Sequence, residues 1–599
     1  MANAALKRGI ASVSLSGGLV DKLHAAAAAG FDVVELFEPD LLGSHCRPES
    51  LRALAGELGI EIEVYQPLRD FEGVAESALK RNLARAEQKF DVMERLGATT
   101  LLVCSNVSND AIDDDVLAAE QLARLAEAAA RRGFKVAYEA LAWGARVNDY
   151  VHSWRIVELA AHPALGVCVD SFHILSARTE LESLARIPLE RIFLVQLADA
   201  PRLPMAPLQW SRHHRCFPGQ GELDVAGVVR SLTGSGYRGL VSLEVFNDTF
   251  RQVPSRRAAV DGMRSLLMLE ESLGLTALAP APDVRGFSFA EVTVDPATKG
   301  LAEPTLSALG FGMAGQHRSK PVRLWEQRGA RVLVNDGPAR LAALAVESSD
   351  PGLAARRAIE LKAPERSRIV GPDEVDMTEV AAPDGTSVFF CRSDGGPQSW
   401  LRDFVLAQAT HDHDGLLRAI DHVGLVQPFG HFDEAVLFWR SVLGLEFAEG
   451  PEFAAPDGLL RGRALRNPHA AVLFTLTAPL LGQGEITPAE VQHVAFQSDD
   501  AFGSADSLLR SAAPLRIPDN YYEELAARFD ITDELLDAMR ARSMLYDRDS
   551  AGGEFFHFYT EPIGLICFEV LERRGGYSGL GAVNAPIRLA AQAAASDCS

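Results

Sequence analysis

The chain has few cysteines and no paired cysteine motif. Seven cysteines are scattered over 599 residues, and no CxxC pattern occurs among them. An odd number of scattered thiols argues against a disulfide framework and suits a reducing compartment. The amino terminus, MANAALKRGIASVSLSGG, has no apolar run of the kind found in secretory signals. The sequence therefore predicts a cytoplasmic protein.

Long hydrophobic segments and an excess of positive charge are also missing. No apolar stretch reaches the roughly 18 residues expected of a membrane-spanning helix. The chain carries 58 basic and 81 acidic residues, which gives a net charge of −23. Such a charge disfavours binding to nucleic acid or to anionic lipid. We therefore expect partners that are small molecules, and the sequence is also compatible with a homo-oligomer.

Short apolar runs alternate with helical segments over residues 1–276. There are eight such runs, at 10–15, 32–37, 60–66, 99–105, 135–141, 166–172, 192–198 and 240–246. Most of them are continuous, as in parallel strands that are buried on both faces. Eight strand–helix units predict a (β/α)₈ barrel of the TIM type. A doubly wound open sheet is the alternative.

After a Pro/Ala-rich linker at 277–284, the pattern changes to short strands and glycine turns. The segments LAALAVESSD (341–350) and VQHVAFQSDD (491–500) resemble each other, as do FAEVTVD (289–295) and IDHVGLV (420–426). These similarities predict two copies of one β-rich unit, at 285–410 and 411–580. The remaining residues, 581–599, are expected to form a tail.

Four consecutive strands of the predicted barrel end with an oxygen-bearing side chain. These residues are Glu139, Asp170, Gln196 and Glu244. Strand ends of this kind line the active site of such a barrel. Three carboxylates and an amide suit a hard divalent cation, namely Mg²⁺, Mn²⁺ or Co²⁺. The alternative is that these groups cap helices or pair with arginines.

Further polar residues are expected at the same mouth. His173, three residues after Asp170, is a candidate general base. Arg69, in QPLRDFEG, has the bidentate geometry that binds a carboxylate. Ser211 and Arg215 lie in a polar loop after the seventh strand and are candidate substrate-binding residues.

The barrel resembles a known family. The four strand-end residues, together with DSFH (170–173) and PGQGELD (218–224), resemble the barrels related to xylose isomerase. Within that superfamily, the segments YQPLRDFEG, YEALAWG, VNDY and QLADAP are similar to bacterial 3-dehydroshikimate dehydratases. The resemblance covers about residues 8–272.

This resemblance implies metal-dependent dehydration of 3-dehydroshikimate to protocatechuate, in quinate and shikimate catabolism. His173 would remove the C4 proton, the C5 hydroxyl would leave from an enolate, and Arg69 and Arg215 would bind the ring carboxylate. The alternative is a keto-sugar isomerase or epimerase, which would accept sugars without a carboxylate and would not depend on Arg69.

A second group of candidate ligands lies in the repeat. His422, His493 and Glu569 each interrupt an apolar strand-like run, where a polar group is costly unless it is paired or bound to metal. Two histidines and one carboxylate form the facial triad typical of non-haem iron sites, so Fe²⁺ or Mg²⁺ is expected. The matching positions of the first copy are Glu291, Ala343 and 389–391, so that copy is predicted to lack the metal.

This part resembles the vicinal-oxygen-chelate superfamily and, more closely, 4-hydroxyphenylpyruvate dioxygenase. The resemblance is carried by VQHVAFQSDD, IPDNYYEEL (517–525), MLYDRD (544–549) and FEVLERRG (568–575). It implies an α+β domain of βαβββ repeats with His422, His493 and Glu569 as ligands. His557 stands where that family has a glutamine, which indicates a diverged pocket. The alternatives are an Fe(II) dioxygenase and a non-enzymatic oligomerisation platform.

Overall fold

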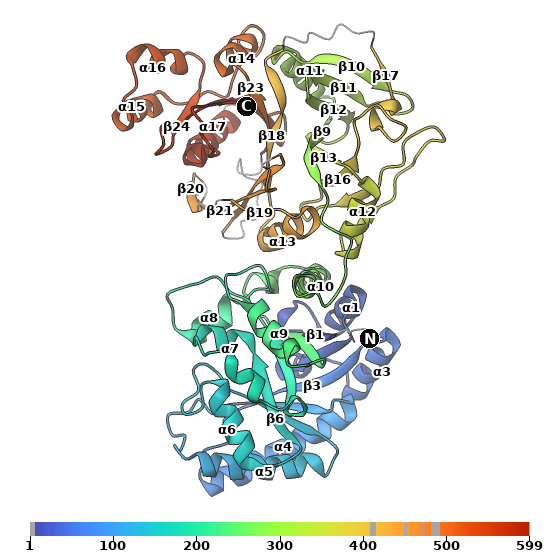
Figure 1. The fold of residues 1–599 in the computed structure, drawn as a ribbon, viewed down its shortest axis with the longest axis vertical. Helices are drawn as coiled ribbons and strands as arrows, with labels where there is room; N and C mark the ends of the chain where they lie inside the picture. The colour runs from blue at the N-terminus through green and yellow to red at the C-terminus, as the bar shows by residue number, and fades with distance from the viewer. Residues whose placement is uncertain are drawn as a thin grey trace. The chain divides into compact units, whose positions relative to one another are not determined.

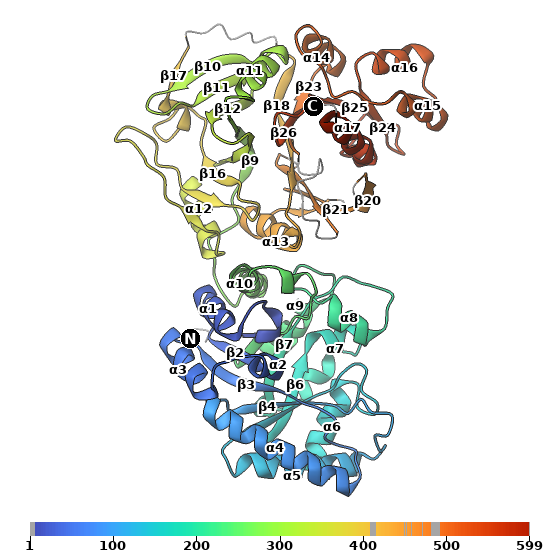
Figure 2. The same cartoon turned by 180° about the vertical axis from the view of Figure 1, so that it is seen from behind.

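The computed structural model describes residues 6–407, 415–448, 450, 452–456, 458–469, 471–480 and 491–597. The chain divides into two compact units, Met1–Leu278 and Ala279–Ser599. In Figures 1 and 2 the first unit runs from blue to green and the second from green to red.

The first unit is a closed barrel of eight parallel strands in sequential order, which confirms the predicted (β/α)₈ fold. The strands are β1 (Lys7–Ala11), β2 (Val33–Phe37), β3 (Glu61–Leu68), β4 (Thr100–Cys104), β5 (Lys135–Glu139), β6 (Leu165–Asp170), β7 (Ile192–Leu197) and β8 (Leu240–Leu243). The helices are α1 (Leu19–Ala29), α2 (Glu38–Leu42), α3 (Pro48–Leu58), α4 (Glu76–Leu96), α5 (Asp115–Ala130), α6 (Tyr150–Ala160), α7 (Ser171–Ser176), α8 (Pro207–His213), α9 (Val225–Gly234) and α10 (Ser255–Ser272).

The barrel interior is filled by apolar side chains from seven of its strands. The cluster consists of Val33, Val64, Leu102, Ala137, Cys168, Leu194 and Leu240, all of them buried. Such a layer closes the barrel to solvent along its axis. The polar residues that follow these positions therefore gather at the carboxyl ends of the strands.

The first strand is shifted from its expected place. The sequence predicts a strand at 10–15, whereas β1 ends at Ala11 and Ser12–Ser14 form a 3₁₀ turn. The hydroxyl of Ser12 accepts a hydrogen bond from the backbone N–H of Phe37, and the hydroxyl of Ser14 accepts one from Val245. These hydrogen bonds to side chains replace backbone pairing at the barrel mouth. The strand therefore ends at Ala11, although the apolar run in the sequence continues.

The second unit contains two curled sheets. The first comprises β9 (Val284–Val294), β10 (Gly312–His317), β11 (Arg323–Gln327), β12 (Ala330–Asp336), β13 (Arg340–Ser348), β14 (Glu365–Arg366), β15 (Glu379–Ala381), β16 (Ser387–Cys391) and β17 (Phe404–Leu406). The second comprises β18 (Leu417–Val426), β19 (Glu446–Phe447), β20 (Glu452–Ala455), β21 (Gly458–Arg466), β22 (Leu473–Pro479), β23 (Gln492–Ser498), β24 (Leu545–Arg548), β25 (Glu554–Tyr559) and β26 (Ile566–Arg574). The helices are α11 (Lys299–Ala308), α12 (Pro351–Glu360), α13 (Phe432–Leu443), α14 (Ala501–Leu508), α15 (Asp519–Arg528), α16 (Asp533–Arg540) and α17 (Ala585–Asp597).

The two sheets share one topology, as the internal repeat predicts. Strand β9 lies between antiparallel β13 and parallel β12, and β18 lies between antiparallel β23 and parallel β22. Aromatic contacts join the halves, with ring centroids 5.1 Å apart for Phe311 and Phe496. The arrangement is that of a vicinal-oxygen-chelate domain with two half-barrels, which confirms the expected fold class (Figure 1).

The strand register corrects one pair of the repeat. In the second copy His422 lies opposite Ala495, and Gly424 lies opposite His493. In the first copy the equivalent ladder places Phe289 opposite Ala345 and Glu291 opposite Ala343. Phe289, rather than Glu291, therefore matches His422. The sequence comparison fails here because it aligns the two apolar strands two residues out of step, and a shift of two residues leaves the alternation of faces unchanged.

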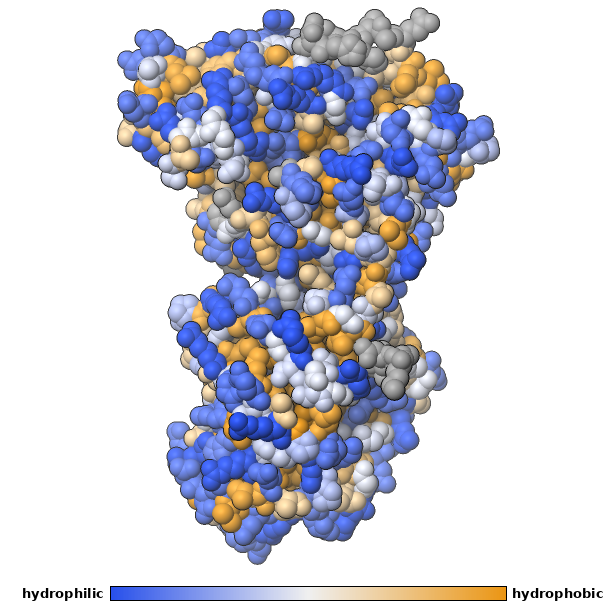
Figure 3. Space-filling model, in the orientation of Figure 1, coloured by the Kyte–Doolittle hydropathy of each residue, from blue (hydrophilic) through white to orange (hydrophobic). Residues whose placement is uncertain are grey.

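Two further features of the organisation are the surface and the end of the chain. On the face shown in Figure 3, hydrophilic residues predominate and apolar residues are scattered among them in small groups. Within the described residues, no helix combines the length and apolarity needed to cross a bilayer. Residues 585–597, expected to belong to a tail, form α17, and Leu589 and Ala591 of this helix are buried.

Because each unit has its own closed or curled sheet and its own core, each should fold by itself. A fragment ending at Leu278 and another starting at Ala279 should both unfold cooperatively on heating, as followed by circular dichroism. A barrel fragment without a cooperative transition would contradict this expectation.

Candidate functional site

The barrel mouth gathers the residues that strand-end reasoning selected. Glu139 and Asp170 are the last residues of β5 and β6, Gln196 lies near the end of β7, and Glu244 directly follows β8. All four side chains are buried. Ligand atoms of Glu139, Asp170 and His173 lie within 4.8 Å of one another.

Arg215 lies among these carboxylates. Its Nη1 atom donates to Asp170 Oδ2 at 2.9 Å and to Glu244 Oε2 at 3.1 Å, and its Nε donates to the hydroxyl of Ser211 at 3.0 Å. The guanidinium stacks 4.5 Å above the ring of Phe172 and is only 1% exposed. Arg215 is thus the counterion of the site, and Ser211 holds it in place.

His173 reaches the same cluster from the first turn of α7. Its Nδ1 lies 3.1 Å from the backbone N–H of Ala142, and its Nε2 lies 3.2 Å from Arg215 Nη2 and 3.4 Å from Glu139 Oε1. Donors at both ring nitrogens disfavour a charged imidazole. Burial also lowers the pKa of His173 to about 4. The ring is therefore neutral near pH 7 and able to accept a proton.

The carboxylates differ in their protonation. Burial, together with the charges of Glu244 and Asp170, raises the pKa of Glu139 well above its ordinary value. Burial also opposes ionisation of Asp170, but the Arg215 guanidinium outweighs this effect and lowers the pKa of that carboxyl. One arginine does not neutralise three acids, so the cluster has the charge to attract a cation.

Sequence reasoning missed the residues that hold Gln196. The amide Nε2 of Gln196 donates to Glu35 Oε2 at 2.8 Å, and the amide of Gln66 donates to the same oxygen at 3.3 Å. Burial and the charge of Glu244 raise the pKa of Glu35 to about 8. Glu35 lies on β2 within the predicted strand 32–37, so the strand-end argument would have found it if extended to that strand.

Arg69 lies at the rim of the mouth rather than within the cluster. It follows β3 and is exposed. Burial raises the pKa of Glu244, and the charge of Arg69 opposes part of this rise. The loop that carries it is fixed, because Asn82 donates to the carbonyl of Asp70 at 2.8 Å and Glu72 accepts from Asn106 N–H at 2.7 Å. No ion pair to Arg69 occurs among the residues that the structure describes.

The donor set at the barrel mouth fits a divalent cation. Oxygen Oε1 of Glu139 and Oε1 of Glu35 are buried and accept no hydrogen bond within the described part of the chain. Unpaired anionic oxygens of this kind are costly in a protein interior unless a cation or a proton compensates them. Oxygen ligands in this number are those that Mg²⁺ and Mn²⁺ prefer.

The role of Arg215 as a counterion can be tested with Arg215→Gln. The metal-free variant should unfold several degrees below the parent, because three buried acids lose their cation. Added Mn²⁺ should then raise its unfolding temperature more than that of the parent, as measured by differential scanning fluorimetry. The control is Arg212→Gln, an exposed arginine of α8. Equal Mn²⁺ responses of the parent and Arg215→Gln would contradict the role.

The second site lies in the concave face of the second sheet. His422 Nε2 is 3.2 Å from Glu569 Oε2, His493 Nε2 is 3.4 Å from the same oxygen, and the two Nε2 atoms are 3.4 Å apart. Adjacent ligands about 2.1 Å from one cation lie about 3 to 3.4 Å apart. Glu569 Oε2 is buried and accepts no hydrogen bond from the described residues, so this triad also fits a divalent metal.

A further set of side chains orients the triad. Asp421 lies 2.9 Å from His422 Nδ1 and forms an ion pair with Arg573. His557 Nδ1 lies 2.8 Å from Glu569 Oε1, and its Nε2 lies 3.0 Å from the amide nitrogen of Asn584. The histidine that stands in place of the glutamine expected from the resemblance therefore positions a ligand.

The titration of the triad follows from this geometry. Burial opposes a charge on His422, but Glu569 and Asp421 outweigh it and raise its pKa to about 9. Burial also opposes ionisation of Glu569, but His422 and His557 keep the pKa of that carboxyl well below its ordinary value. Burial lowers the pKa of His493, so the site holds a permanent carboxylate beside a neutral imidazole.

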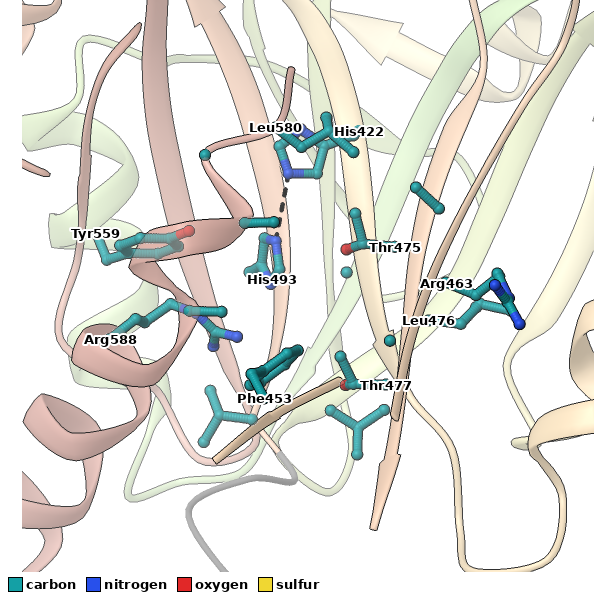
Figure 4. Close-up of a pocket in the computed structure, with 18 residues that line it drawn as sticks. His422, Phe453, Arg463, Thr475, Leu476, Thr477, His493, Tyr559, Leu580 and Arg588 are labelled. Carbon is teal, nitrogen blue, oxygen red and sulfur yellow. Dashed lines mark hydrogen bonds between the residues drawn. The ribbon is translucent and has the colours of Figure 1, made fainter. Parts of the chain in front are cut away.

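The triad opens into a pocket whose space of about 700 Å³ is in part open to solvent. Tyr559 and Arg588 lie on one side of the histidines, and Thr475 and Thr477 lie on the other (Figure 4). Arg588 comes from α17, the helix in the expected tail, so sequence reasoning missed it. The pocket combines a buried cation, aromatic rings and hydroxyls, which suits a small anionic ligand.

Gly424 is a structural requirement of this site. A Cβ atom added there would lie 1.9 Å from Cε1 of His493. Gly424→Ala should therefore displace His493 and weaken Mn²⁺ binding by at least about tenfold, as measured by isothermal titration of chelator-treated protein. Gly300→Ala is the control, because a Cβ at Gly300 meets no atom within 4 Å. Unchanged Mn²⁺ binding in Gly424→Ala would exclude His493 as a ligand.

Comparison with known proteins covers the whole chain. Residues 23–269 match the family described as xylose isomerase-like TIM barrel. The 3-dehydroshikimate dehydratase of Pseudomonas putida is 43% identical over 98% of this chain and 98% of its own length. That of Pseudomonas aeruginosa is 44% identical over 98% and 99%. A solved xylose isomerase-like TIM barrel/4-hydroxyphenylpyruvate dioxygenase fusion protein is 41% identical, with a TM-score of 0.87, and the match covers 99% of this chain and 100% of that one.

Proposed function

The chain belongs to the 3-dehydroshikimate dehydratase family, and we propose that its barrel converts 3-dehydroshikimate to protocatechuate. The observation that carries this proposal is the neutral, buried His173 beside the acidic cluster of Glu139, Asp170 and Glu244. This arrangement provides a base next to a site for a divalent cation. The product would place the reaction in the catabolism of quinate and shikimate.

His173 has the geometry of a general base. In the substrate the C4 hydrogen is α to the C3 ketone, and the C5 hydroxyl is β to it. His173 would accept the C4 proton at Nε2, the nitrogen that faces the carboxylates, in the tautomer that carries its own proton on Nδ1. In that tautomer Nδ1 no longer accepts from the Ala142 N–H, which lies 3.1 Å away in the structure, so the ring has to turn from this contact. Asp170 lies 3.9 Å from that atom and would stabilise the imidazolium while the proton is held.

The divalent cation would be Mg²⁺, Mn²⁺ or Co²⁺, with Glu139, Asp170, Gln196 and Glu244 as ligands. It would supply Lewis-acid stabilisation of the enolate. His173 would return its proton to the departing C5 hydroxyl, which leaves as water. The ring then tautomerises to the aromatic product. One molecule of 3-dehydroshikimate thus gives one molecule of protocatechuate and one of water. The buried walls of the mouth exclude bulk water during these transfers.

Arg69 is our candidate for the ring carboxylate of the substrate. It is exposed at the rim, and its loop is anchored by Asn82 and Asn106. Ser211 and Arg215 are expected to bind substrate as well. In the structure Ser211 accepts a hydrogen bond from Arg215, and Arg215 donates to Asp170 and Glu244. Arg215 would reach a substrate only if it left Asp170 and Glu244.

For the second unit we propose a divalent metal, Fe²⁺ or Mg²⁺, held by His422, His493 and Glu569. Two observations support this assignment: the distances within the triad, and Oε2 of Glu569, which accepts no hydrogen bond from the described residues. The replacement of a glutamine by His557 at the ligand carboxylate favours a pocket that has diverged from dioxygenase chemistry. Dehydration by the barrel should therefore not depend on this metal.

The proposal is tested by adding 3-dehydroshikimate to the full chain with Mn²⁺ and following the absorbance of protocatechuate. His173→Ala should lower kcat by at least about 100-fold, because the base is lost while the strand scaffold is kept. The matched control is His493→Ala, a buried histidine of the other site, which should retain the activity.

Circular dichroism of both variants should show an unchanged fold, and EDTA should abolish the activity of the parent. Turnover of His173→Ala within a few-fold of the parent would disprove the base assignment. Loss of dehydration in His493→Ala, with oxygen uptake by the parent, would instead favour a reaction centred on the second unit.

A further inference from the structure

The first half of the second unit has a pocket of its own that is open to solvent, here named the first cup. Its space of about 850 Å³, part of it open to solvent, lies against β9, β12 and β16. Six of its lining residues bear on what it binds, namely Phe289, Glu291, His317, Arg368, Phe389 and Trp400. By topology it is the counterpart of the pocket that contains the triad.

The floor of the first cup is aromatic where the second copy has its ligands. The ladder register matches Phe289 to His422, Ala343 to His493 and Phe389 to Glu569. The ring centroid of Phe289 lies 4.7 Å from that of Trp400 and 6.2 Å from that of Phe389. The metal site has been replaced by three rings that line the cup, with Phe289 in contact with the other two, and they provide an apolar wall for a planar ligand.

Arg368 supplies a positive charge beside this floor. Its guanidinium carbon lies 5.5 Å from the ring centroid of Phe389, and Nη1 makes one hydrogen bond of 3.4 Å, to the carbonyl of Met377. Within the described part of the chain, no carboxylate forms an ion pair with it. Lys320 differs, because its ammonium lies 2.6 Å from Glu374 and is neutralised there.

His317 and Glu291 of the cup are compatible with an anion, whereas Asp403 is a carboxylate in its lining. Nδ1 of His317 accepts from the backbone N–H groups of Ser319 and Lys320 at 3.2 Å each, so the ring proton is on Nε2. Burial raises the pKa of Glu291, which accepts a hydrogen bond from Asn335 at 2.8 Å. Asp403 is buried and accepts from Val375 N–H at 2.9 Å.

We propose that the first cup is a binding site for an aromatic monocarboxylate. The ring would pack on Phe289, Phe389 and Trp400, and the carboxylate would pair with Arg368. This assignment does not depend on the reaction in the barrel or on the metal of the second cup.

The probe is 4-hydroxybenzoate, titrated calorimetrically into EDTA-treated full chain. Arg69 and Arg588 offer other places for a carboxylate, so the titration uses the double variant Arg69→Gln, Arg588→Gln. In this background, adding Arg368→Gln should weaken binding by at least about tenfold. Adding Arg356→Gln instead, an exposed arginine paired with Glu360, should leave the affinity unchanged.

The aromatic part of the proposal is tested with cyclohexanecarboxylate, which has the same charge and a saturated ring. It should bind about fivefold more weakly than 4-hydroxybenzoate in the same background. Thermal unfolding should be unchanged by Arg368→Gln, since the side chain makes a single long hydrogen bond. The same isotherm with and without Arg368 would overturn the proposal, as would the absence of binding in the double variant. Equal affinity for the two acids would overturn the aromatic assignment.

Discussion

Uncompensated negative charge in a buried place is the constraint on which both sites of this protein depend. At the barrel mouth three carboxylates from three strands lie with a single guanidinium between two of them. In the second unit, Glu569 is held between His422 and His557. Each site needs a positive partner, and the residues around it are arranged to supply one, either from the chain or from a metal. This need also explains why Ser211, Asp421 and Asn584 are placed where they are, since each orients a charged or titratable neighbour.

The barrel site could be predicted from sequence because parallel strands bring their carboxyl ends to one edge. Glu139 and Asp170 follow from this rule alone. The position of Arg215 does not, because it depends on how the loop after α8 folds back over Phe172. A motif shows that an arginine is present, but only the packed loop shows that it faces protein acids rather than solvent.

The repeat shows where comparison of segments loses accuracy. Comparison of the similar segments made Glu291 the equivalent of His422, the first histidine of the triad, whereas the strand register makes Phe289 the equivalent residue. A shift of two residues along a strand keeps each side chain on the same face, so the apolar pattern does not reveal it. The helix α17 was missed for a related reason, since its short alanine-rich sequence does not show that Arg588 faces a pocket.

The close packing of His493 on Gly424 has a consequence for how the two copies diverged. In the first copy the same ladder step carries Glu291, which faces Ala343. A histidine at 343 would meet the Glu291 side chain where His493 meets bare backbone. The lost metal site could therefore not be regained through its three ligands alone, because a fourth change, to glycine, would have to come first. This extra requirement makes a return to metal binding in the first half difficult, and the first cup could instead evolve to bind a ligand of another kind.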